Sequence, residues 1–293
     1  MYPEPTTIAQ LLHLGERVLS DSSHIFDDHD NQREAEDLMA FCLKTKRSQL
    51  KRRAPVPART RDRYLALVAR RAGGEPFPFL VGGTTFFGLH MEVRPGAFVP
   101  RPSSELAVIR SLTRLKGRRE PVVVDVCTGA GPIALAIAHE RPNSEVWGSD
   151  ISEDGLRVAR LNARKLGIDN VTFRRGDMYD ALPTELRGEA DLIVGHVPYV
   201  APHELDDLPA EVREFEPVFT LMGDSVDGFE LMRRAVAEGT EWLKPGGWML
   251  LELADDLAPK VRRLTRKAGL EDHGVGADDD HLTVIVEARK PPE

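Results

Sequence analysis

Hydrophobic residues recur with two different periods along the chain. Over about the first 75 residues they recur every three or four positions, as in amphipathic helices that bury one face. From about residue 101 onward, short apolar runs alternate with helical stretches. This alternation predicts a twisted, largely parallel sheet with helices on both faces. We therefore expect an α/β fold that is preceded by a small helical domain.

Three helices are expected in the helical domain, which we assign to residues 1–75. Thr6 or Thr7 can cap the first helix, because a threonine side chain can accept a hydrogen bond from a free backbone N–H. The third helix runs from about residue 60 to 71 and stops at Gly73-Gly74. The expected inward-facing residues are Ile8, Leu11, Leu12, Val18, Leu19, Ala35, Leu38, Met39, Cys42, Tyr64, Leu65 and Val68.

The segment 76–100 differs in character from both of its neighbours. Residues 84–87 and 90–93 have the composition of two strands, and Gly88-Leu89 would close the turn between them. We therefore expect a β-hairpin that links the helical domain to the sheet domain.

An arginine between two prolines follows the hairpin. Pro100-Arg101-Pro102 favours an extended chain, which would hold Arg101 and Glu105 at a fixed point. Ser103 could cap the helix that comes next. Composition alone would favour the alternative, a plain interdomain linker with an exposed arginine.

A glycine turn between a strand and a helix lies within residues 122–150. The apolar run 122–124 predicts a buried strand that ends at Asp125. The small residues 128–131 then form a turn against whose backbone a ligand can lie. A second strand ends at Asp150. A glycine turn followed by an acid at the end of the next strand is typical of nucleoside binding, with the carboxylate on the ribose hydroxyls.

Two ligands compete for this turn. A dinucleotide site would have a third glycine where Ala134 stands. Asp125 counts for more, because a carboxylate there would repel a pyrophosphate but would suit the cationic amino-acid end of S-adenosylmethionine. We therefore expect S-adenosylmethionine as the cofactor. A turn that binds no ligand would leave both acids without a purpose.

Two further strand ends carry candidate site residues. Asp177 follows a third strand, where it could accept the exocyclic amine of an adenine or be an ordinary turn residue. A fourth strand, residues 191–194, runs into Gly195-His196-Val197-Pro198-Tyr199. This rigid turn combines a polar side chain, a proline and an aromatic ring at the carboxyl end of a central strand. That is where α/β enzymes keep their chemistry.

The same alternation assigns the rest of the sheet. A turn at residues 244–247 leads into a fifth strand, 248–252. A helix over about 257–268 precedes two final strands, of which the last covers 281–288. We assign residues 101–293 to this cofactor-binding catalytic domain.

Composition excludes several classes of protein. At 293 residues, with 41% hydrophobic and 29% charged residues, the chain is typical of a globular protein. No apolar run approaches the length of a membrane span, and the first residues lack the pattern of a signal peptide. The two cysteines, Cys42 and Cys127, lie in different segments, which favours reduced thiols and a cytoplasmic location. No cysteine and histidine cluster has metal-ligand spacing, so we expect no metal.

The net charge of −8 hides a basic segment. Residues 44–71 contain eleven lysines and arginines and a single acid, Asp62. A solvated helical surface explains such a segment, and a docking face for an acidic partner is the alternative. No aromatic residues alternate with the basic ones, so we expect no dedicated nucleic-acid module.

With these segments assigned, the chain resembles the HemK/PrmC family of protein-glutamine N5-methyltransferases. These enzymes modify the GGQ motif of peptide-chain release factors. The resemblance covers nearly the whole chain and its order of parts. The matching segments are the helical N-terminal domain, Gly-Glu-Pro at 74–76, Phe87-Gly88, Pro-Arg-Pro-x-x-Glu at 100–105, Asp-x-x-Thr-Gly-x-Gly at 125–131, Arg-Glu-Phe-Glu-Pro at 213–217, and Asp227-Gly228.

The resemblance implies a fold, a cofactor and a set of site residues. The fold is the Rossmann-like class I methyltransferase sheet of seven strands with its last strand antiparallel, and the cofactor is S-adenosylmethionine. The residues expected to contact the cofactor are Asp125, Thr128, Gly129, Gly131, Asp150, Asp177, Arg101 and His196. The residues expected in catalysis are His196, Pro198 and Tyr199. The residues expected to bind the substrate are Val197, Tyr199, Glu105, Phe215 and Glu216.

The chain departs from the family at its signature. The family has Asn-Pro-Pro-Tyr after the fourth strand, and this chain has His196-Val197-Pro198-Tyr199. In the family, the asparagine side chain and the next backbone carbonyl bind the two protons of the target amide nitrogen, and the tyrosine packs along the substrate. A histidine can supply one acceptor, or it becomes a donor when protonated. Cys127 also stands where the family usually has a glycine.

Three hypotheses about function follow. The first is methylation of a glutamine-like amide nitrogen in a protein, with the helical domain docking that substrate. The second is methylation of a small guanidino, amine or hydroxyl compound, with His196 as the proton acceptor. The third is cofactor binding without catalysis, against which the intact cofactor acids argue. His196 favours the second hypothesis, while the retained helical domain and the segments 100–105 and 213–217 favour the first.

Overall fold

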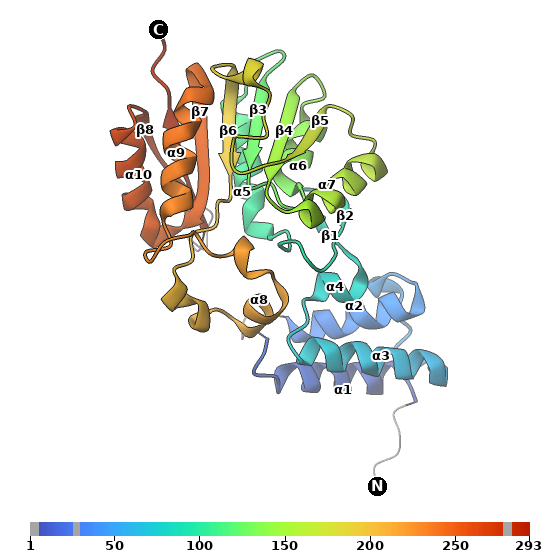
Figure 1. Cartoon of the computed structure of the whole chain (residues 1–293). Helices are drawn as coiled ribbons and strands as arrows, with labels where there is room; N and C mark the ends of the chain where they lie inside the picture. The colour runs from blue at the N-terminus through green and yellow to red at the C-terminus, as the bar shows by residue number, and fades with distance from the viewer. Residues whose placement is uncertain (1–5, 26–29, 278–282) are drawn as a thin grey trace. The chain divides into compact units, whose positions relative to one another are not determined.

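The computed structural model describes residues 6–25, 30–277 and 283–293, and its chain forms two compact units (Figure 1). The first unit comprises Met1–Gly83 together with Asp206–Glu216. The second comprises Thr84–Leu205 and Pro217–Glu293. The hairpin region from residue 84 therefore belongs to the second unit, and a segment from the middle of the chain belongs to the first.

The first unit is a small helical bundle. Its helices are α1 (Ile8–Ser20), α2 (Asn31–Leu43), α3 (Ala58–Ala72), the short α4 (Phe77–Val81) and α8 (Ala210–Phe215). Thr7 caps α1, as predicted, because its side chain accepts a hydrogen bond from the Gln10 backbone N–H. The backbone N–H of Gly73 closes the end of α3 on the carbonyls of the last turn.

Helical spacing decides which residues of this bundle are buried. Tyr64, Leu67 and Val68 point into the core of the bundle. The prediction placed Leu65 there, but Leu65 is only half-buried, because residues three and four positions apart share a helix face. The helix α4 was not predicted; it lies inside the segment assigned to the hairpin linker.

A buried arginine holds the two pieces of the first unit together. Arg71 is 1% exposed. Its guanidinium donates from Nε to Oε2 of Glu34, at 2.7 Å, and from Nη1 to Oε2 of Glu211, at 2.8 Å. Glu34 lies on α2 and Glu211 on α8, so two carboxylates neutralise one cation that has left water.

The second unit contains a two-stranded sheet and a seven-stranded sheet. Strand order in the larger sheet is β5-β4-β3-β6-β7-β9-β8. Its first five strands pair in parallel, and β9 is antiparallel to both β7 and β8, which confirms the expected class I arrangement. The strands are β1 (Gly83–Phe86), β2 (Leu89–Glu92), β3 (Val122–Val126), β4 (Glu145–Asp150), β5 (Val171–Arg175), β6 (Ala190–Gly195), β7 (Leu243–Ala254), β8 (Glu271–Ala277) and β9 (Thr283–Arg289).

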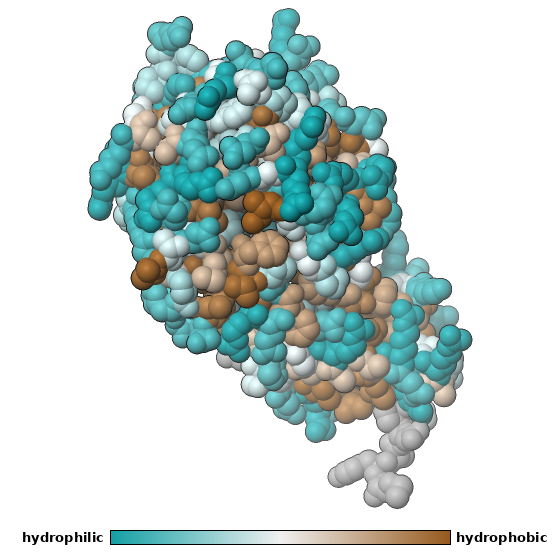
Figure 2. All heavy atoms as spheres, viewed as in Figure 1, coloured by the Kyte–Doolittle hydropathy of each residue, from teal (hydrophilic) through white to brown (hydrophobic). Residues whose placement is uncertain are grey.

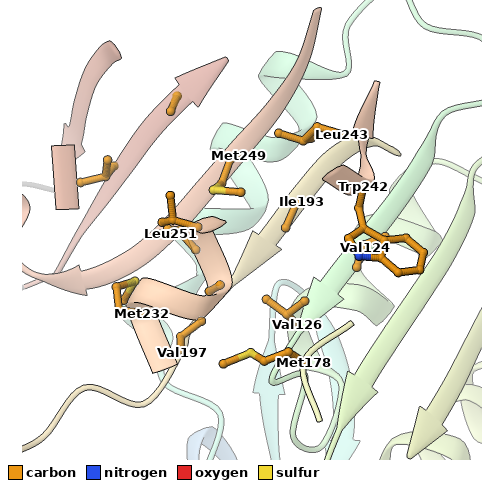
Figure 3. Packing of buried hydrophobic residues seen from close by; sticks show 14 of the residues in the cluster. Val124, Val126, Met178, Ile193, Val197, Met232, Trp242, Leu243, Met249 and Leu251 are labelled. Carbon is orange, nitrogen blue, oxygen red and sulfur yellow. The ribbon is translucent and has the colours of Figure 1, made fainter. Parts of the chain in front are cut away.

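Helices cover both faces of the large sheet (Figure 1). Successive strand residues point to opposite faces, so Val123 packs on one helix layer and Val124 on the other. Figure 3 shows the layer around Val124, where Ile193 and Met249 meet Met232 of α9. The helices are α5 (Glu105–Arg114), α6 (Pro132–Glu140) and α7 (Glu153–Leu166) on one face, and α9 (Glu230–Trp242) and α10 (Ala258–Lys267) on the other. The short 3-10 turns of the unit are Pro102–Ser104, Thr184–Leu186, Val218–Thr220 and Asp255–Leu257, and the 3-10 turn Pro202–Asp207 spans the point where the chain passes from this unit to the first.

The predicted hairpin is present, but its turn lies one residue earlier than expected. Phe87 and Gly88 both have positive φ, 49° and 76°. A two-residue turn of this kind fits the twist of paired strands, so the pair Phe87-Gly88 closes the hairpin and Leu89 starts the second strand.

Three other predicted boundaries differ. Ser103 does not cap α5, because Pro102–Ser104 form a 3-10 turn and the helix starts at Glu105. The expected turn at 244–247 is included in the long strand β7. No helix was named for 230–242, where α9 lies. The predicted start of the last strand, at residue 281, lies outside the described residues.

The surface in Figure 2 is mostly hydrophilic, as expected when apolar side chains fill the two cores. Large apolar side chains that remain exposed include Val218, Phe219 and Val226. Among the helices of the described residues, none has the length and apolarity that a membrane crossing requires.

Candidate active site

Four polar residues meet at the carboxyl ends of neighbouring parallel strands. Asp125 lies next to the last residue of β3, Asp150 ends β4, His196 follows β6, and Glu252 lies near the end of β7. The pairing of Gly195 with Leu251 fixes the register of β6 and β7, so the next residues along, His196 and Glu252, become neighbours. In an open α/β sheet this edge is where ligands bind.

Asp125 holds the glycine turn from inside the protein. It is 1% exposed, and its Oδ2 accepts hydrogen bonds from Thr128 Oγ1, at 2.6 Å, and from the Ala134 backbone N–H, at 3.2 Å. Burial raises the pKa of Asp125 to about 7, against the lowering effect of these two hydrogen bonds. The carboxyl group therefore fixes the turn to the first turn of α6.

Asp150 holds the same turn from the next strand. Its Oδ2 accepts from the Gly129 backbone N–H and its Oδ1 from the Ser152 backbone N–H, both at 2.8 Å. Burial raises the pKa of Asp150, and the backbone hydrogen bonds act in the opposite direction. Each carboxylate oxygen has a second lone pair, which leaves capacity to accept from ribose hydroxyls.

The backbone of the turn explains why the family usually has a glycine where this chain has Cys127. Cys127 has φ +57°, a left-handed conformation that favours glycine, which is the residue that the family usually has there. Gly129 and Gly131 also have positive φ, 56° and 79°. A Cβ built on Gly129 would have no heavy atom within 4 Å, so the space beside this residue is open.

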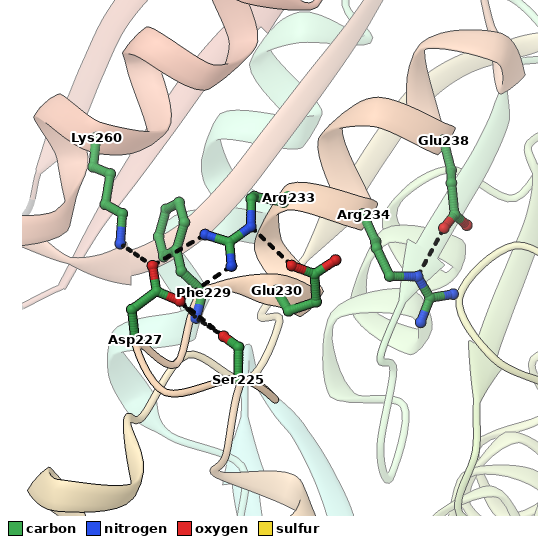
Figure 4. Close-up of polar contacts among 8 residues, drawn as sticks. All are labelled: Ser225, Asp227, Phe229, Glu230, Arg233, Arg234, Glu238 and Lys260. Atoms are coloured by element: carbon green, nitrogen blue, oxygen red, sulfur yellow. Dashed lines mark hydrogen bonds and ion pairs between the residues drawn. The ribbon is translucent and has the colours of Figure 1, made fainter.

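Asp177 is exposed and paired within the chain. Its Oδ2 lies 3.0 Å from Nη1 of Arg234, which also binds Glu238 on the same helix (Figure 4 shows the Arg234–Glu238 pair). The carboxylate lies just after β5, where the sequence predicted a contact with adenine. A ligand amine at Asp177 would share the carboxylate with Arg234.

His196 lies among two aromatic rings and a carboxylate. Its ring meets the Phe98 ring edge-on, with centroids 5.5 Å apart, and stacks at 25° to Tyr199, with centroids 6.0 Å apart. Its Nδ1 lies 3.5 Å from Oε1 of Glu252. The imidazole is 24% exposed, so part of the ring is accessible to a ligand.

Glu252 is a site residue that the sequence analysis did not select. Its side chain is fully buried, and its Oε1 accepts a hydrogen bond from Ser104 Oγ at 2.7 Å. Within the described part of the chain, its Oε2 has no hydrogen-bond partner. The available signal was an acid at the end of the apolar run 248–251, where a core strand would otherwise continue.

The rest of the signature segment is anchored by packing. Val197 is fully buried and points into the core cluster in Figure 3. Burial raises the pKa of Tyr199 to about 12. A Cβ on Gly228, which has φ +63°, would lie 2.6 Å from the Tyr199 carbonyl oxygen and from the Ala201 nitrogen. The loop before α9 therefore supports the backbone of 198–201 and tolerates only glycine at that position.

An exposed ion-pair network fixes that loop to its helix (Figure 4). Asp227 accepts from Arg233, Lys260 and Ser225, and also from the backbone N–H of Phe229. These contacts lower the pKa of Asp227. The resemblance at Asp227-Gly228 thus corresponds to a support for the signature segment.

Arg101 and Glu105 have partners in the second unit. The Arg101 guanidinium lies 4.9 Å from the centre of the Phe98 ring, which in turn contacts His196. Glu105 was predicted to bind substrate; its Oε1 accepts a hydrogen bond from the Phe87 backbone N–H at 2.6 Å and so holds the hairpin turn.

Phe215 and Glu216, also predicted to bind substrate, belong to the first unit. Phe215 ends α8 and is half-buried, with a ring atom 3.5 Å from the Cβ position of Gly74. Glu216 is buried. The structure therefore groups Asp125, Thr128, Gly129, Gly131, Asp150, His196, Pro198 and Tyr199 at one sheet edge and describes these two residues with the helical bundle.

The residues at the sheet edge fit S-adenosylmethionine. The open space at Gly129 allows close approach to the backbone, and Asp150 retains acceptor capacity for a ribose. A histidine, cysteine and carboxylate cluster able to hold a metal ion is absent from residues 6–25, 30–277 and 283–293.

Comparisons with known proteins agree with this geometry. The PrmC N-terminal domain matches residues 10–82, and a methyltransferase domain matches residues 118–277. The release factor glutamine methyltransferase of Burkholderia pseudomallei is 39% identical over 284 residues, covering 94% of this chain and 93% of that protein. The enzyme of the same description from Streptomyces coelicolor is 35% identical over 261 residues, covering 88% of this chain and 90% of its own length.

Solved structures support the fold. A T. thermophilus 16S rRNA methyltransferase in complex with AdoMet and guanosine matches with a TM-score of 0.53 at 20% identity, over 71% of this chain and 49% of that one. A methyltransferase from Pyrococcus furiosus matches with a TM-score of 0.51 at 18% identity, over 80% of this chain and all of that one. The chain belongs to the HemK/PrmC family of S-adenosylmethionine-dependent methyltransferases.

Proposed function

We propose that this methyltransferase modifies the side-chain amide nitrogen of a glutamine in a protein of the release-factor type. The observation that carries the proposal is the segment 196–199 at the end of β6, which sets a hydrogen-bond acceptor, His196, beside an aromatic ring, Tyr199. The relatives named release factor glutamine methyltransferases cover both units of the chain, which favours a substrate of the same class.

The turn after β3 and its neighbours hold the cofactor in this proposal. When bound, S-adenosylmethionine supplies an electrophilic methyl group. Asp150 accepts from the ribose hydroxyls, and Gly129 and Gly131 allow close approach of the backbone. Thr128 and Asp125 keep the turn in shape, since the Asp125 carboxylate binds Thr128 and the start of α6. Asp177 and Arg101 extend the contacts at either side.

The segment after β6 holds the acceptor nitrogen. His196 and the backbone carbonyl of Val197 accept the two protons of the amide, and this pair of hydrogen bonds orients a weak nucleophile toward the methyl group. Pro198 keeps the turn rigid, and Tyr199 packs along the substrate. Glu105, Phe215 and Glu216 are the other residues that bind the substrate in this proposal.

A small-molecule acceptor is the second candidate, and the observation that favours it is His196 itself. An imidazole can remove a proton from an amine, a guanidinium or a hydroxyl around methyl transfer, which an asparagine cannot do. The outcome of the labelling experiment below decides between the two substrates.

The helical unit docks the protein substrate in this proposal. In residues 44–71, the exposed basic residues for which no ion pair is recorded within the described chain include Lys44, Lys46, Lys51, Arg53 and Arg59. Arg52 is already paired with Glu36. Arg71 is paired with Glu34 and Glu211. The exposed group is therefore the part of the basic segment that is available to an acidic partner.

The cytoplasmic location inferred from cysteine usage stays a prediction.

Labelled S-adenosylmethionine added to an extract of the source cells tests the proposal. We expect the label to enter the protein fraction in the size range of release factors, and only when the enzyme is added. Label that enters only the small-molecule fraction would contradict the proposal and favour the second candidate.

A further inference from the structure

The register of the sheet makes His196 and Glu252 neighbours. Val194 pairs with Leu250 and Gly195 with Leu251, so the chain continues with His196 beside Glu252 on parallel strands. Nδ1 of the imidazole lies 3.5 Å from Oε1 of the carboxylate. Because side chains alternate along a strand, both point to the sheet face that carries α5.

The buried carboxylate of Glu252 needs hydrogen-bond donors around it. The carboxylate is fully buried, and burying a charge is costly unless donors surround it. Ser104, at the start of α5, donates one hydrogen bond to Oε1, and Oε2 has no hydrogen-bond partner in the described residues. Among the described residues, the nitrogen-bearing side chain recorded beside this carboxylate is the imidazole of His196, through its Nδ1.

We propose that Glu252 is a positioning residue that keeps a proton on Nδ1 of His196, so that Nε2 stays a free acceptor for the methyl-accepting nitrogen. A neutral imidazole carries its proton on one ring nitrogen and accepts a hydrogen bond with the other. A hydrogen-bond acceptor beside one nitrogen holds the proton there, and the other nitrogen then becomes the acceptor. This inference rests on the proposed function, since it assigns His196 to the acceptor side of the site.

The arrangement explains how a histidine can replace the family's asparagine. An asparagine oxygen accepts a proton of the target nitrogen in a hydrogen bond but does not remove it. With the Nδ1 proton held by Glu252, Nε2 accepts that hydrogen bond in the same way. The nitrogen forms its bond to the methyl carbon as the carbon–sulfur bond breaks and the sulfur keeps the electron pair. The surplus proton of the nitrogen then passes to Nε2.

Other charged and titratable groups act on this pair. Tyr199 stacks on His196 from the loop after β6, and Asp125 on β3 faces Glu252 with a like charge. Glu204 and Asp256 act on Tyr199. Arg101 lies over Phe98, whose ring edge touches the imidazole. Glu252 is the group within ion-pair distance of Nδ1 in the described residues.

Nitrogen NMR of the full chain labelled at its histidines tests the tautomer directly. The signals of His196 are assigned by their loss in His196→Asn. At a pH where the imidazole is neutral, we expect His196 to carry its proton on Nδ1. A proton on Nε2 in the unmodified protein would overturn the proposal, and this measurement needs neither substrate nor activity.

The isosteric change Glu252→Gln tests the role of the carboxylate. A glutamine amide keeps the volume and can still accept from Ser104, but it can donate to Nδ1 and so move the imidazole proton to Nε2. We expect the NMR tautomer to change and kcat to fall on the order of 10²–10⁴-fold, with KM for the acceptor and the affinity for S-adenosylhomocysteine little changed. An unchanged tautomer and unchanged kcat would overturn the proposal.

A double-mutant cycle shows whether Glu252 acts through His196. In a His196→Asn background, Glu252→Gln should reduce kcat much less than it does alone, because the imidazole it positions is gone. Equal losses in both backgrounds would contradict the positioning role. A failure of the proposed protein substrate would leave the tautomer measurement intact, so the two proposals fail separately.

Discussion

The turn after β3 and the segment after β6 lie at adjacent strand ends, yet their polar groups are satisfied in different ways. In the turn, Asp125 and Asp150 accept hydrogen bonds from the backbone and side chains of the turn and of the segments that flank it. After β6, His196 depends on Glu252, which comes from a strand much later in the chain.

This difference separates two parts of the function. The turn keeps the family pattern except at Cys127, and it serves a cofactor that all members share. The segment 196–199 departs from the pattern and faces the methyl acceptor. Changes in the turn should therefore alter cofactor binding or stability, and changes after β6 should alter turnover.

The largest effect is expected at His196. The change His196→Asn restores an acceptor but removes the basic nitrogen, so kcat/KM should fall by about 10²–10⁴-fold. The variant should also lose the part of the pH dependence of kcat/KM that proton transfer to the imidazole causes. Initial rates measured across pH check both statements.

The opposite result would mean that the segment 196–199, like the turn after β3, only holds its ligand by hydrogen bonds. If His196→Asn keeps full activity and an unchanged pH profile, the imidazole is only an acceptor, as the asparagine of the family is. Affinity for S-adenosylhomocysteine, measured for both proteins, shows whether a loss of activity comes from weaker cofactor binding.

A pH effect on stability is expected from Asp125. Its folded-state pKa is about 7, above the ordinary value near 3.9, so the folded protein favours the protonated carboxyl. This stabilisation is fully present below about pH 4 and is lost as pH rises through 7, with an upper bound of about 4 kcal/mol. Asp125→Asn, which mimics the protonated form, should flatten this loss in urea unfolding at several pH values. A slope equal to that of the unmodified protein would refute it.

A smaller effect, on cofactor affinity, is expected from Asp150. Asp150→Ala removes hydrogen bonds from ribose hydroxyls to a charged acceptor, each worth about 1.5–3 kcal/mol. Binding of S-adenosylhomocysteine should weaken roughly ten- to a hundredfold by calorimetry. Asp169→Ala, at an exposed position after α7, is the matched control and should bind normally. Unchanged affinity in Asp150→Ala would remove this residue from the cofactor site.

The smallest effect is expected from the basic segment. Lys51→Glu with Arg53→Glu should raise KM for a folded protein substrate by roughly tenfold or less and flatten its salt dependence, while a short peptide is processed as before. Arg263→Glu with Lys267→Glu, on α10, makes the same change of charge and should leave KM unaltered. Identical kinetics for both pairs would indicate that the basic segment is only a solvated surface.

The strands and the glycine turn could be predicted because their signals are local. Residues 122–124 are an apolar run within β3, Pro132 suits a helix start, and Asp150 ends the next strand. The Thr7 cap and the hairpin follow equally from neighbouring residues, with an error of one residue at the turn, whereas the cap predicted at Ser103 is wrong. The hydrogen-bond partners of the turn come from the same short stretch of sequence.

The partners of distant residues could not be predicted. Glu252 meets His196 only because β6 and β7 pair in one register, and a single sequence does not state that register. Glu105 accepts a hydrogen bond from the Phe87 backbone N–H for the same kind of reason, a contact that the sequence did not indicate. Arg71 between Glu34 and Glu211 is a third example.

The most direct test of the account is mass spectrometry of a purified release factor from the same organism after incubation with the enzyme and S-adenosylmethionine. The account predicts one added methyl group, located by fragmentation on the amide nitrogen of a single glutamine, and a strong reduction when the enzyme carries Glu252→Gln. A release factor that stays unmodified while a small amine or guanidino compound is methylated by the same enzyme would contradict it.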